Sequence, residues 1–496
     1  MTGETTGEGR ATSRGKATGR GAADWPYRRI TDAQCEELHR AAVSVLERTG
    51  VRLELPRAVE LFRAAGARVD ADGIVRIPAE LVAWALERVP RAFTIYDQTG
   101  APAMVLDGER TYFGPGSDCL NLLDHRTGAR REPVMADVAA GIDLVDALAN
   151  IDYVMSLVLP TDVDDRVADR HQMREMLTRT RKPIVLVTYE ASGCHDAVAM
   201  AEVVAGGSAA LAARPFLACY VNTATGLLHN ADALEKVIFL AERGIPILYI
   251  PGSQAGVTGP ATPAGAVVVF WAGVLTGLVL AQIVREGAPV MTKGWGGSGL
   301  DMKTMVYGYA SPDQRATAIA LSRWADLPSF ALAGASDSKL VDQQAAAEAA
   351  LTLAVDTLAG PDAVHDLGYL ESGLTYSFAQ LAICDEIVGW LRHLRAPYDT
   401  SAEALALDLI AEVGPDKQFL TTPHTMRHFR ELYYPSLFER ATYQAWREKD
   451  GRTLAERAGG RVEKLLDAAP EREPLACDEE LRAIIAAAER RVSESG

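Results

Sequence analysis

The stretch PSFALAGASDSKLVDQQ, residues 328–344, reads as a strand, a polar loop and the start of a helix. The apolar run at 330–333 has the length of a buried strand. Gly334, a cluster of Ser, Asp and Lys residues and an alanine-rich helical segment follow it. In a closed parallel barrel, loops of this kind lie at the carboxyl ends of the strands, where catalytic groups gather. We therefore expect the rest of the chain to repeat this unit.

Strand-like and helical runs do alternate through the middle of the chain. The apolar, strand-like runs are 111–113, 151–159, 184–189, 216–222, 245–250, 289–294, 329–333 and 364–370. Helical runs follow most of them, and eight such units of roughly 30 residues predict an α/β fold of the (β/α)8 TIM barrel type. A doubly wound open sheet is the alternative. No GxGxxG motif follows an early strand, which weakens a dinucleotide-binding version of it.

The flanking segments predict four regions in all. Residues 1–24, rich in Gly, Thr and Arg, are expected to form a disordered tail. Residues 25–108 mix short helices and extended pieces and predict a small α+β cap. The barrel is expected at 109–396, and 397–496 is expected to be a helical extension that acts as a lid or an interface.

The composition excludes several classes of protein. The chain has 496 residues, 48% hydrophobic and 23% charged, with a formal net charge of −16. An acidic balance argues against a nucleic-acid-binding protein. The six cysteines show neither CxxC pairs nor zinc-type spacing, so we expect reduced thiols in a cytoplasmic protein that binds no metal. The amino terminus lacks the apolar core of a secretory signal.

One uncharged segment, AGAVVVFWAGVLTGLVLAQIV at 264–284, is long enough to span a membrane. It contains three glycines and lies between two strand-like runs, in step with the barrel repeat. We interpret it as a wholly buried helix at the barrel wall or at a subunit interface, so that the protein is expected to be a homo-oligomer without contact to a membrane.

The ends of the predicted strands are rich in aromatic and acidic side chains. Such a mixture suits a cationic, poorly hydrated ligand, because ring faces attract ammonium groups. Tyrosine is also common at strand ends that bind nothing. By position, the residues expected at the mouth are Tyr112, Asp118, Tyr189, Glu190, Asn222, Tyr249, Trp295, Asp337, Lys339, Tyr369 and Glu371. Those chosen for substrate contact are Tyr189, Asn222, Tyr249, Trp295, Asp337, Lys339 and Glu371.

Three further groups allow two interpretations each. Lys293, near the end of the sixth strand, could form a Schiff base, although pairing with Asp301 or another carboxylate at the mouth is favoured. His424 and His428 in HTMRH have the i, i+4 spacing of metal ligands, but without a third ligand an ordinary helix face is favoured. Asp385 and Glu386 are expected to be charges on a helix surface.

Several motifs together resemble the trimethylamine methyltransferase family, including its members that lack pyrrolysine. They are GLDMKTMVYGYASP at 299–312, GASDSKLVDQQAAAE at 334–348, YLESGLTYSFAQLAICDE at 369–386 and HTMRHFRELYYPSLFERATYQAW at 424–446. The amino-terminal TDAQCEELHRAAVSVLERTGVRLE at 31–54 is similar to the family as well. The resemblance implies a (β/α)8 barrel that demethylates a methylamine and passes the methyl group to Co(I) of a corrinoid on a partner protein.

The chain contains only the twenty standard residues. The resemblance then implies the chemistry of pyrrolysine-free members, which act on quaternary amines such as glycine betaine. A quaternary nitrogen already carries its charge, so transfer to Co(I) needs only alignment and exclusion of water. No cofactor is expected on this chain itself, because the corrinoid belongs to the partner.

The resulting hypothesis is a small betaine bound at the mouth of the barrel. Tyr189, Tyr249 and Trp295 would form an aromatic cage. Asp337 or Glu371 would balance the ammonium group, and Lys339 or Lys293 would bind the carboxylate. The alternatives are a Schiff-base lyase that uses Lys293, a non-catalytic protein that binds methylated amines, and a zinc-dependent methyltransferase, which the cysteine spacing disfavours.

Overall fold

The computed structural model describes residues 27–294, 299–311 and 313–495. At its centre is a parallel sheet whose strands hydrogen-bond in the order β6-β17-β16-β13-β12-β10-β9. These strands are β6 (Tyr112–Pro115), β9 (Ile184–Val187), β10 (Leu217–Asn222), β12 (Ile247–Ile250), β13 (Val290–Gly294), β16 (Ser329–Leu332) and β17 (Ala363–Leu367).

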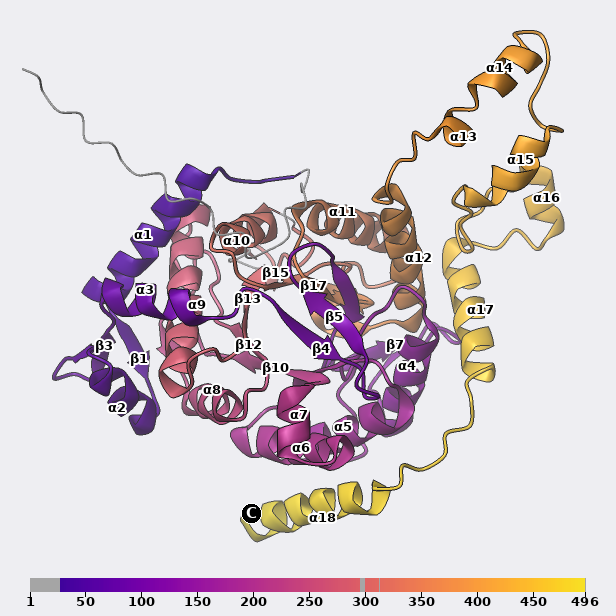
Figure 1. Ribbon diagram of the computed structural model, residues 1–496. Coiled ribbons are helices and arrows are strands. Elements are labelled where there is room, and N and C mark those ends of the chain that lie inside the picture. Colours follow the sequence, from indigo (N-terminus) through magenta and orange to yellow (C-terminus); the bar gives the residue numbers. More distant parts are fainter. Residues whose placement is uncertain (1–26, 295–298, 312, 496) are drawn as a thin grey trace, which may run out of the picture.

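Residues 151–158 close this sheet into a barrel. The amide of Asp152 donates to the carbonyl of Phe113 at 2.7 Å, next to β6. On the other side the amide of Val185 donates to the carbonyl of Val154 at 2.9 Å, next to β9. This closing strand is irregular, because Leu157 within it has a left-handed φ of 61°. The predicted (β/α)8 barrel is confirmed, and Figure 1 looks along its axis.

A ring of helices surrounds the strands (Figure 1). They are α4 (Met135–Ala147), α5 (Ala168–Arg179), α6 (Ala191–Ala205), α7 (Ser208–Ala213), α8 (Ala231–Arg243), α9 (Pro263–Val284), α10 (Asp313–Trp324), α11 (Gln343–Ala359) and α12 (Phe378–Leu394). Side chains alternate along each strand, so that one set fills the barrel and the other packs under the helices. On β12, for example, Leu248 and Ile250 belong to the inner core of the barrel, and Ile247 belongs to the outer core under the helices.

Helix α9 is the uncharged segment. It is the single helix in the described part of the chain that is long and apolar enough to cross a membrane. In its most apolar stretch of 18 residues, 78% is buried inside the protein. Helices of the same chain cover it, namely α1 (Asp32–Arg48), α2 (Pro56–Ala64) and α3 (Ala79–Arg88). It therefore packs as a core helix, and its apolar surface is already used within the chain.

The amino-terminal segment contributes to the barrel itself. Strands β1 (Val51–Leu53), β2 (Arg68–Val69) and β3 (Ile74–Arg76) form a small sheet with β11 (Leu228–His229). The hairpin of β4 (Phe93–Tyr96) and β5 (Pro102–Leu106) closes the amino end of the barrel, where Ile95, Met104 and Leu106 join the inner core. The boundary at 108 stays a prediction, and the expected tail at 1–24 lies outside the described residues.

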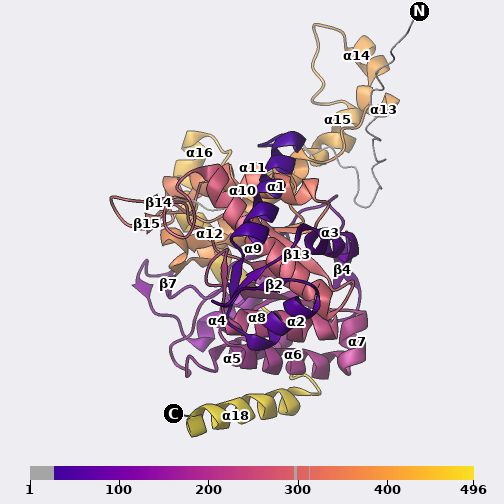
Figure 2. The ribbon, with the colours of Figure 1, turned by 90° about the vertical axis from the view of Figure 1, so that its left-hand side faces the viewer.

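Short strands lie at the opposite end of the barrel, beyond the carboxyl ends of its strands. They are β7 (Asn121–Leu123), β8 (Arg130–Arg131), β14 (Leu300–Asp301), β15 (Val306–Tyr307), β18 (Tyr369–Leu370) and β19 (Thr375–Tyr376). Figure 2 shows β7, β14 and β15 on one side of the molecule and β4 on the opposite side. The carboxyl ends of the strands therefore open under β14 and β15, and we call this end the mouth.

The carboxyl-terminal region leaves the barrel and returns to it. A projecting arm, residues 397–452, contains α13 (Ala402–Leu405), α14 (Leu407–Val413), α15 (Pro423–His428) and α16 (Tyr443–Glu448). Helix α17 (Leu454–Asp467) then packs on α12 and α4, and α18 (Asp478–Ser495) packs on α6. Helix α18 lies within the helical extension predicted at 397–496, and Asp478, Glu479 and Glu480 mark its acidic first turn.

The interpretation of Asp385 and Glu386 as surface charges is wrong. Their exposed fractions are 1% and 4%. Arg461 of α17 lies 3.2 Å from Asp385 and 3.4 Å from Glu386. Because α17 covers this face of α12, the two carboxylates anchor the returning chain to the barrel.

Candidate functional site

Four side chains from different strands meet inside the barrel near its mouth, and we call them the inner cluster. They are Tyr220 of β10, Lys293 of β13, Phe330 of β16 and His365 of β17. On three of these strands the residue two positions earlier, Ala218, Met291 or Ala363, belongs to the inner core. The period of two along a strand therefore directs these side chains inward.

Lys293 is the buried cation of this group, with an exposed fraction of 4%. Its Nζ lies 3.4 Å from the hydroxyl oxygen of Tyr220 and 5.8 Å from the centre of that ring. Burial lowers the pKa of Lys293 to about 7, and the negative charge of Asp366 opposes this effect. The amine thus titrates near neutral pH, and its protonated form can bind a ligand carboxylate.

Asp366 supplies the negative charge. It is 1% exposed, and its φ of 75° is left-handed, which is uncommon outside glycine. Its Oδ2 accepts a hydrogen bond of 2.8 Å from the hydroxyl of Tyr309, and its Oδ1 lies 2.6 Å from Nδ1 of His365. A strained backbone that holds a buried carboxylate is typical of a functional site.

His365 lies between these groups and the aromatic rings. Its ring stacks on Phe330 with centres 4.5 Å apart and meets the edge of Tyr220 at 5.6 Å. Its Nδ1 faces the carboxylate of Asp366, whereas Nε2 has no hydrogen-bond partner within the described ranges. Buried polar atoms without partners are rare, so Nε2 indicates a place where a ligand supplies a contact.

A second carboxylate, Asp118, follows β6 at the same end of the barrel. It also has a left-handed φ, 57°, and it accepts a hydrogen bond of 2.8 Å from the hydroxyl of Ser156. Removal from water raises its pKa to about 6. Burial raises the pKa of Tyr369, and the charges of Asp366 and Asp118 both add to this rise, so Tyr369 lies under the influence of the two carboxylates.

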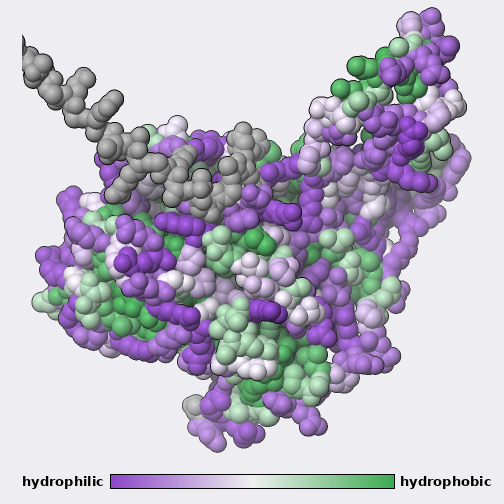
Figure 3. Space-filling view, viewed as in Figure 1, coloured by the Kyte–Doolittle hydropathy of each residue, from purple (hydrophilic) through white to green (hydrophobic). Residues whose placement is uncertain are grey.

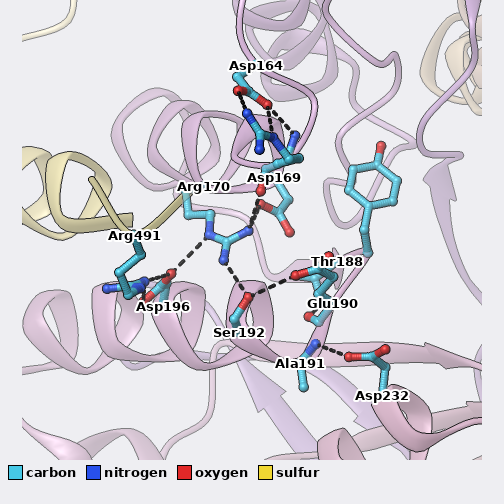
Figure 4. A network of polar contacts seen from close by, with 12 residues as sticks. Asp164, Asp169, Arg170, Thr188, Glu190, Ala191, Ser192, Asp196, Asp232 and Arg491 are labelled. Carbon is cyan, nitrogen blue, oxygen red and sulfur yellow. Dashed lines mark hydrogen bonds and ion pairs between the residues drawn. The ribbon is translucent and has the colours of Figure 1, made fainter. Parts of the chain in front are cut away.

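A network of polar contacts lies around the start of α6, directly after the loop that follows β9 (Figure 4). The guanidinium of Arg170 lies 2.8 Å from Asp169 and 3.0 Å from Asp196, and it donates to Ser192 at 3.0 Å. Arg491 of α18 reaches the same Asp196 at 2.6 Å. The carboxyl-terminal helix thereby supports one side of the mouth.

Of the predicted contact residues, the structure brings only Lys293 into the inner cluster. Tyr189 lies on the rim with an exposed fraction of 44%, and Asn222 is exposed at the last position of β10. Trp295 lies outside the described residues. Asp301 accepts a hydrogen bond of 2.8 Å from the amide of Lys303 within its own turn, whereas the charge that acts on Lys293 comes from Asp366, another carboxylate at the mouth.

Tyr249 points away from the mouth. It is fully buried, it belongs to the outer core under the helices, and its hydroxyl lies 2.6 Å from Nδ1 of His229. A Cβ at Gly277 of α9 would come within 2.1 Å of the Tyr249 ring. The residue is one position out of phase with Leu248 and Ile250, so it packs against α9 and takes no part in the inner cluster.

The polar residues of the opening motif hold the mouth loops together. Asp337 accepts hydrogen bonds from the amide of Tyr309 at 3.1 Å and the hydroxyl of Ser372 at 2.8 Å. The exposed Lys339 donates to the carbonyl of Asp337 at 2.7 Å. Glu371 pairs with Arg130 at 2.7 Å. In this arrangement the three residues contact protein groups, and Asp337 fixes the loop that carries Tyr309.

The site therefore combines residues that sequence reasoning missed. Tyr220, Tyr309, His365 and Asp366 were not among the residues that the strand-end pattern marked. Asp118 was expected at the mouth by its position but was not chosen as a ligand. A groove of about 440 Å³ lies between α1 and α3, but none of these residues lines it, so it is separate from this site. The cluster offers one buried cation, the carboxylate of Asp366 and several ring faces, and Asp118 adds a second carboxylate at the same end of the barrel.

A family model and curated relatives identify the family of this chain. A family model described as "Trimethylamine methyltransferase (MTTB)" matches residues 4–494. The chain is 30% identical over 434 residues to trimethylamine methyltransferase MttB of Desulfitobacterium hafniense (strain DSM 10664 / DCB-2), covering 86% of this chain and 87% of that protein. It is 29% identical over 448 residues to the glycine betaine methyltransferase of Desulfitobacterium hafniense (strain Y51), with coverage of 89% and 92%. Among solved structures, the monomethylamine methyltransferase of Methanosarcina barkeri matches with 13% identity and a TM-score of 0.45, covering 90% of this chain and 93% of that one.

Proposed function

This chain belongs to the trimethylamine methyltransferase family and is a methyltransferase, and from this premise we propose that its substrate is a small betaine-like quaternary amine. In this proposal one methyl group passes to Co(I) of a corrinoid that a separate protein carries. The observation that carries the choice of substrate is the burial of Lys293 near Asp366 inside one barrel mouth.

The two charges match the two ends of a betaine. A glycine betaine molecule has a permanent positive charge on nitrogen and a carboxylate one carbon away. The carboxylate of Asp366 balances the nitrogen, and the protonated amine of Lys293 binds the carboxylate. A quaternary nitrogen has no N–H to donate, so the ring faces of Tyr220, Tyr309 and Phe330 provide its remaining contacts.

The transfer step needs no proton at the amine. The methyl carbon leaves nitrogen without the bonding electrons, which stay on nitrogen as the lone pair of a tertiary amine. The acceptor contributes the electron pair of the new bond. The role of this chain is then to align the C–N bond with the mouth and to exclude water from it. The tertiary amine product has lost the permanent charge that Asp366 holds, which favours its release.

The corrinoid protein is proposed to dock at the mouth. The hairpin of β14 and β15 stands there with Met302, Met305 and Val306 exposed to 65%, 67% and 44%. Exposed methionines adapt to a partner surface more readily than stiffer side chains do. A partner bound on this hairpin would deliver its methyl acceptor directly above Lys293 and Asp366.

We propose further that the protein acts as a homo-oligomer in the cytoplasm. Apolar residues gather on the projecting arm, the green patches at the upper right of Figure 3. Leu405, Leu407 and Ile410 on α13 and α14 are each about half exposed or more, at 49%, 67% and 51%. A second copy that covers this face would account for them. Light scattering should give a dimer or larger species, and replacement of all three residues by serine should give the monomer.

A Schiff-base lyase is the second candidate, and the pKa of Lys293 near 7 favours it, because a neutral amine is the reactive form. Borohydride treatment with a small carbonyl compound distinguishes the two functions. In a lyase, reduction of the Schiff base links the carbonyl compound irreversibly to Lys293, so the chain gains mass and loses activity. A methyltransferase keeps its original mass and its activity.

The experiment that tests the proposed function mixes the chain, a Co(I) corrinoid protein and a panel of methylated amines. The panel holds glycine betaine, choline, trimethylamine and proline betaine. We expect loss of one methyl group from a betaine together with methylation of the corrinoid. Binding of a betaine without methyl loss from any amine would instead support a non-catalytic binding protein, and failure to bind any of them would contradict the proposal.

A further inference from the structure

We propose that the projecting arm contains a metal site of the Zn²⁺ class formed by Glu403, His424 and His428. One ligand atom of each residue lies within 4.8 Å of the others. A carboxylate and two imidazoles form a common donor set for zinc with three protein ligands and one open position. This site is far from the inner cluster and does not depend on the proposed function.

The fold supplies the ligand that the sequence lacked. His424 and His428 are one helical turn apart on α15, and their ring centres are 4.3 Å apart. Glu403 comes from α13, more than 20 residues earlier, and its Oε1 lies 3.2 Å from Nε2 of His428. The backbone carbonyl of Glu403 lies 3.1 Å from Nε2 of His424. The arm therefore folds back on itself to bring the three donors together.

Glu431 gives the cluster a second feature of metal sites. Its Oε1 lies 2.8 Å from Nδ1 of His428. A carboxylate on one ring nitrogen holds the proton there and leaves the lone pair on the other nitrogen, which here faces Glu403. Histidines that bind metals are regularly oriented by such a carboxylate. The arrangement Glu431–His428–Glu403 thus presents Nε2 of His428 toward the proposed ion.

Arg427 competes for the same carboxylate. Its guanidinium lies 2.7 Å from Oε1 of Glu403. Zinc bonds to imidazole nitrogen at about 2.0–2.1 Å, so the three donors must move together and Arg427 must shift toward solvent or to the other carboxylate oxygen. With all four groups partly exposed, that shift requires no buried rearrangement. An ion-pair cluster without metal is the competing explanation.

A metal would give the arm a local source of stability. Helices α13 and α15 have four and six residues. Helices of this length are not stable alone, and neither buries a side chain in the described structure. A bond through zinc would join the two halves of the arm and fix its direction relative to the barrel.

The test uses the full-length chain without an affinity tag, treated with a chelator and then titrated with zinc chloride. We expect one zinc per chain by elemental analysis after dialysis. His424→Ala, His428→Ala and Glu403→Gln should each lose this stoichiometric zinc. His171→Ala is the matched control, because His171 pairs with Glu489 at 3.2 Å elsewhere on the surface and should keep the zinc.

Two readouts keep the proposal falsifiable if a variant folds poorly. Zinc should slow proteolysis between residues 397 and 450 in the unaltered chain and in Arg427→Ala, but not in Glu403→Gln, which retains a partner for Arg427. The proposal is overturned if the unaltered chain binds no more zinc than the His424→Ala, His428→Ala double variant. It is overturned equally if zinc protects Glu403→Gln as well as the unaltered chain.

Discussion

The hydroxyl of Tyr309 donates a hydrogen bond of 2.8 Å to Oδ2 of Asp366. This bond joins the loop after β15 to the last strand of the barrel, and Asp337 holds the same loop from its other side through the amide of Tyr309. The carboxylate that we assign to the substrate nitrogen is therefore fixed before any ligand binds. Preorganisation of this kind reduces the entropy that binding must overcome.

Asp366→Asn should weaken glycine betaine binding by about 10- to 100-fold, a loss of about 1.4–2.8 kcal/mol. Asparagine keeps the size of the side chain and tolerates the left-handed φ, so the fold should persist. Isothermal titration measures the affinity, and Asp301→Asn on the exposed hairpin is the control. Equal affinities in Asp366→Asn and the unaltered chain would show that the nitrogen binds elsewhere.

Lys293→Met should reduce the affinity for glycine betaine but leave that for choline, which has no carboxylate, within about twofold. The affinity of the unaltered chain for glycine betaine should also fall as pH rises through about 7, where Lys293 loses its proton. The variant should show no such fall. A parallel loss for both ligands would remove Lys293 from the role of carboxylate partner.

The same lysine should make stability depend on pH. Its folded pKa of about 7 is depressed below the unfolded value of about 10.4, so between these values the unfolded chain binds more protons and stability rises with pH. Lys293→Met should therefore be more stable than the unaltered chain by roughly 5 kcal/mol below pH 7, and this gain should shrink toward pH 10. Urea unfolding at pH 6, 8 and 10 measures this, and a pH-independent gain would contradict a buried amine that titrates.

Tyr220 and Tyr249 test which side chains face the inside of the barrel and which face the helices. Tyr220→Phe should change betaine affinity, because its hydroxyl contacts Lys293. Tyr249→Phe should leave affinity unchanged but destabilise the fold by about 1–2 kcal/mol, since it leaves the buried His229 without its partner. Titration and urea unfolding of both variants check this. The opposite pattern would mean that Tyr249 faces the ligand.

Arg461→Ala should destabilise the fold by about 2–4 kcal/mol, because it removes the cation next to the buried Asp385 and Glu386. Burial already raises the pKa of Asp385 above its ordinary value. A raised carboxyl pKa means that the native state binds more protons, so the loss of stability in Arg461→Ala should shrink as pH falls from 8 to 5.

Arg452→Ala, in an exposed pair with Asp450, is the control and should change stability by less than about 0.5 kcal/mol at any pH. A loss of stability in Arg461→Ala that is equal at pH 5 and pH 8 would speak against the buried pair.

Regular repetition made the barrel predictable. The run predicted at 245–250 contains β12 (Ile247–Ile250), and the helix predicted at 264–284 is α9 (Pro263–Val284). The phase of the side chains was not predictable in the same way. In Ile-Leu-Tyr-Ile every residue is apolar, since a strand covered on both faces shows no alternation, so nothing marked Tyr249 as outward.

The inner cluster was missed for a related reason. Candidates were chosen at strand ends, whereas His365 and Asp366 lie within the last strand. The polar pair His-Asp inside the apolar run at 363–367 was the available signal, because charged residues are rarely buried without a purpose. Tyr309 could not be placed from sequence, since a loop of the sixth unit brings it to the eighth strand. Likewise only the folded arm brings Glu403 to His424 and His428.

A crystal structure of the chain grown with glycine betaine shows whether the barrel mouth is the substrate site. We expect the trimethylammonium group against the carboxylate of Asp366 and the rings of Tyr220 and Tyr309, with the ligand carboxylate within hydrogen-bond distance of Lys293 Nζ. Betaine bound anywhere outside the barrel mouth, with Lys293 and Asp366 untouched, would contradict the account.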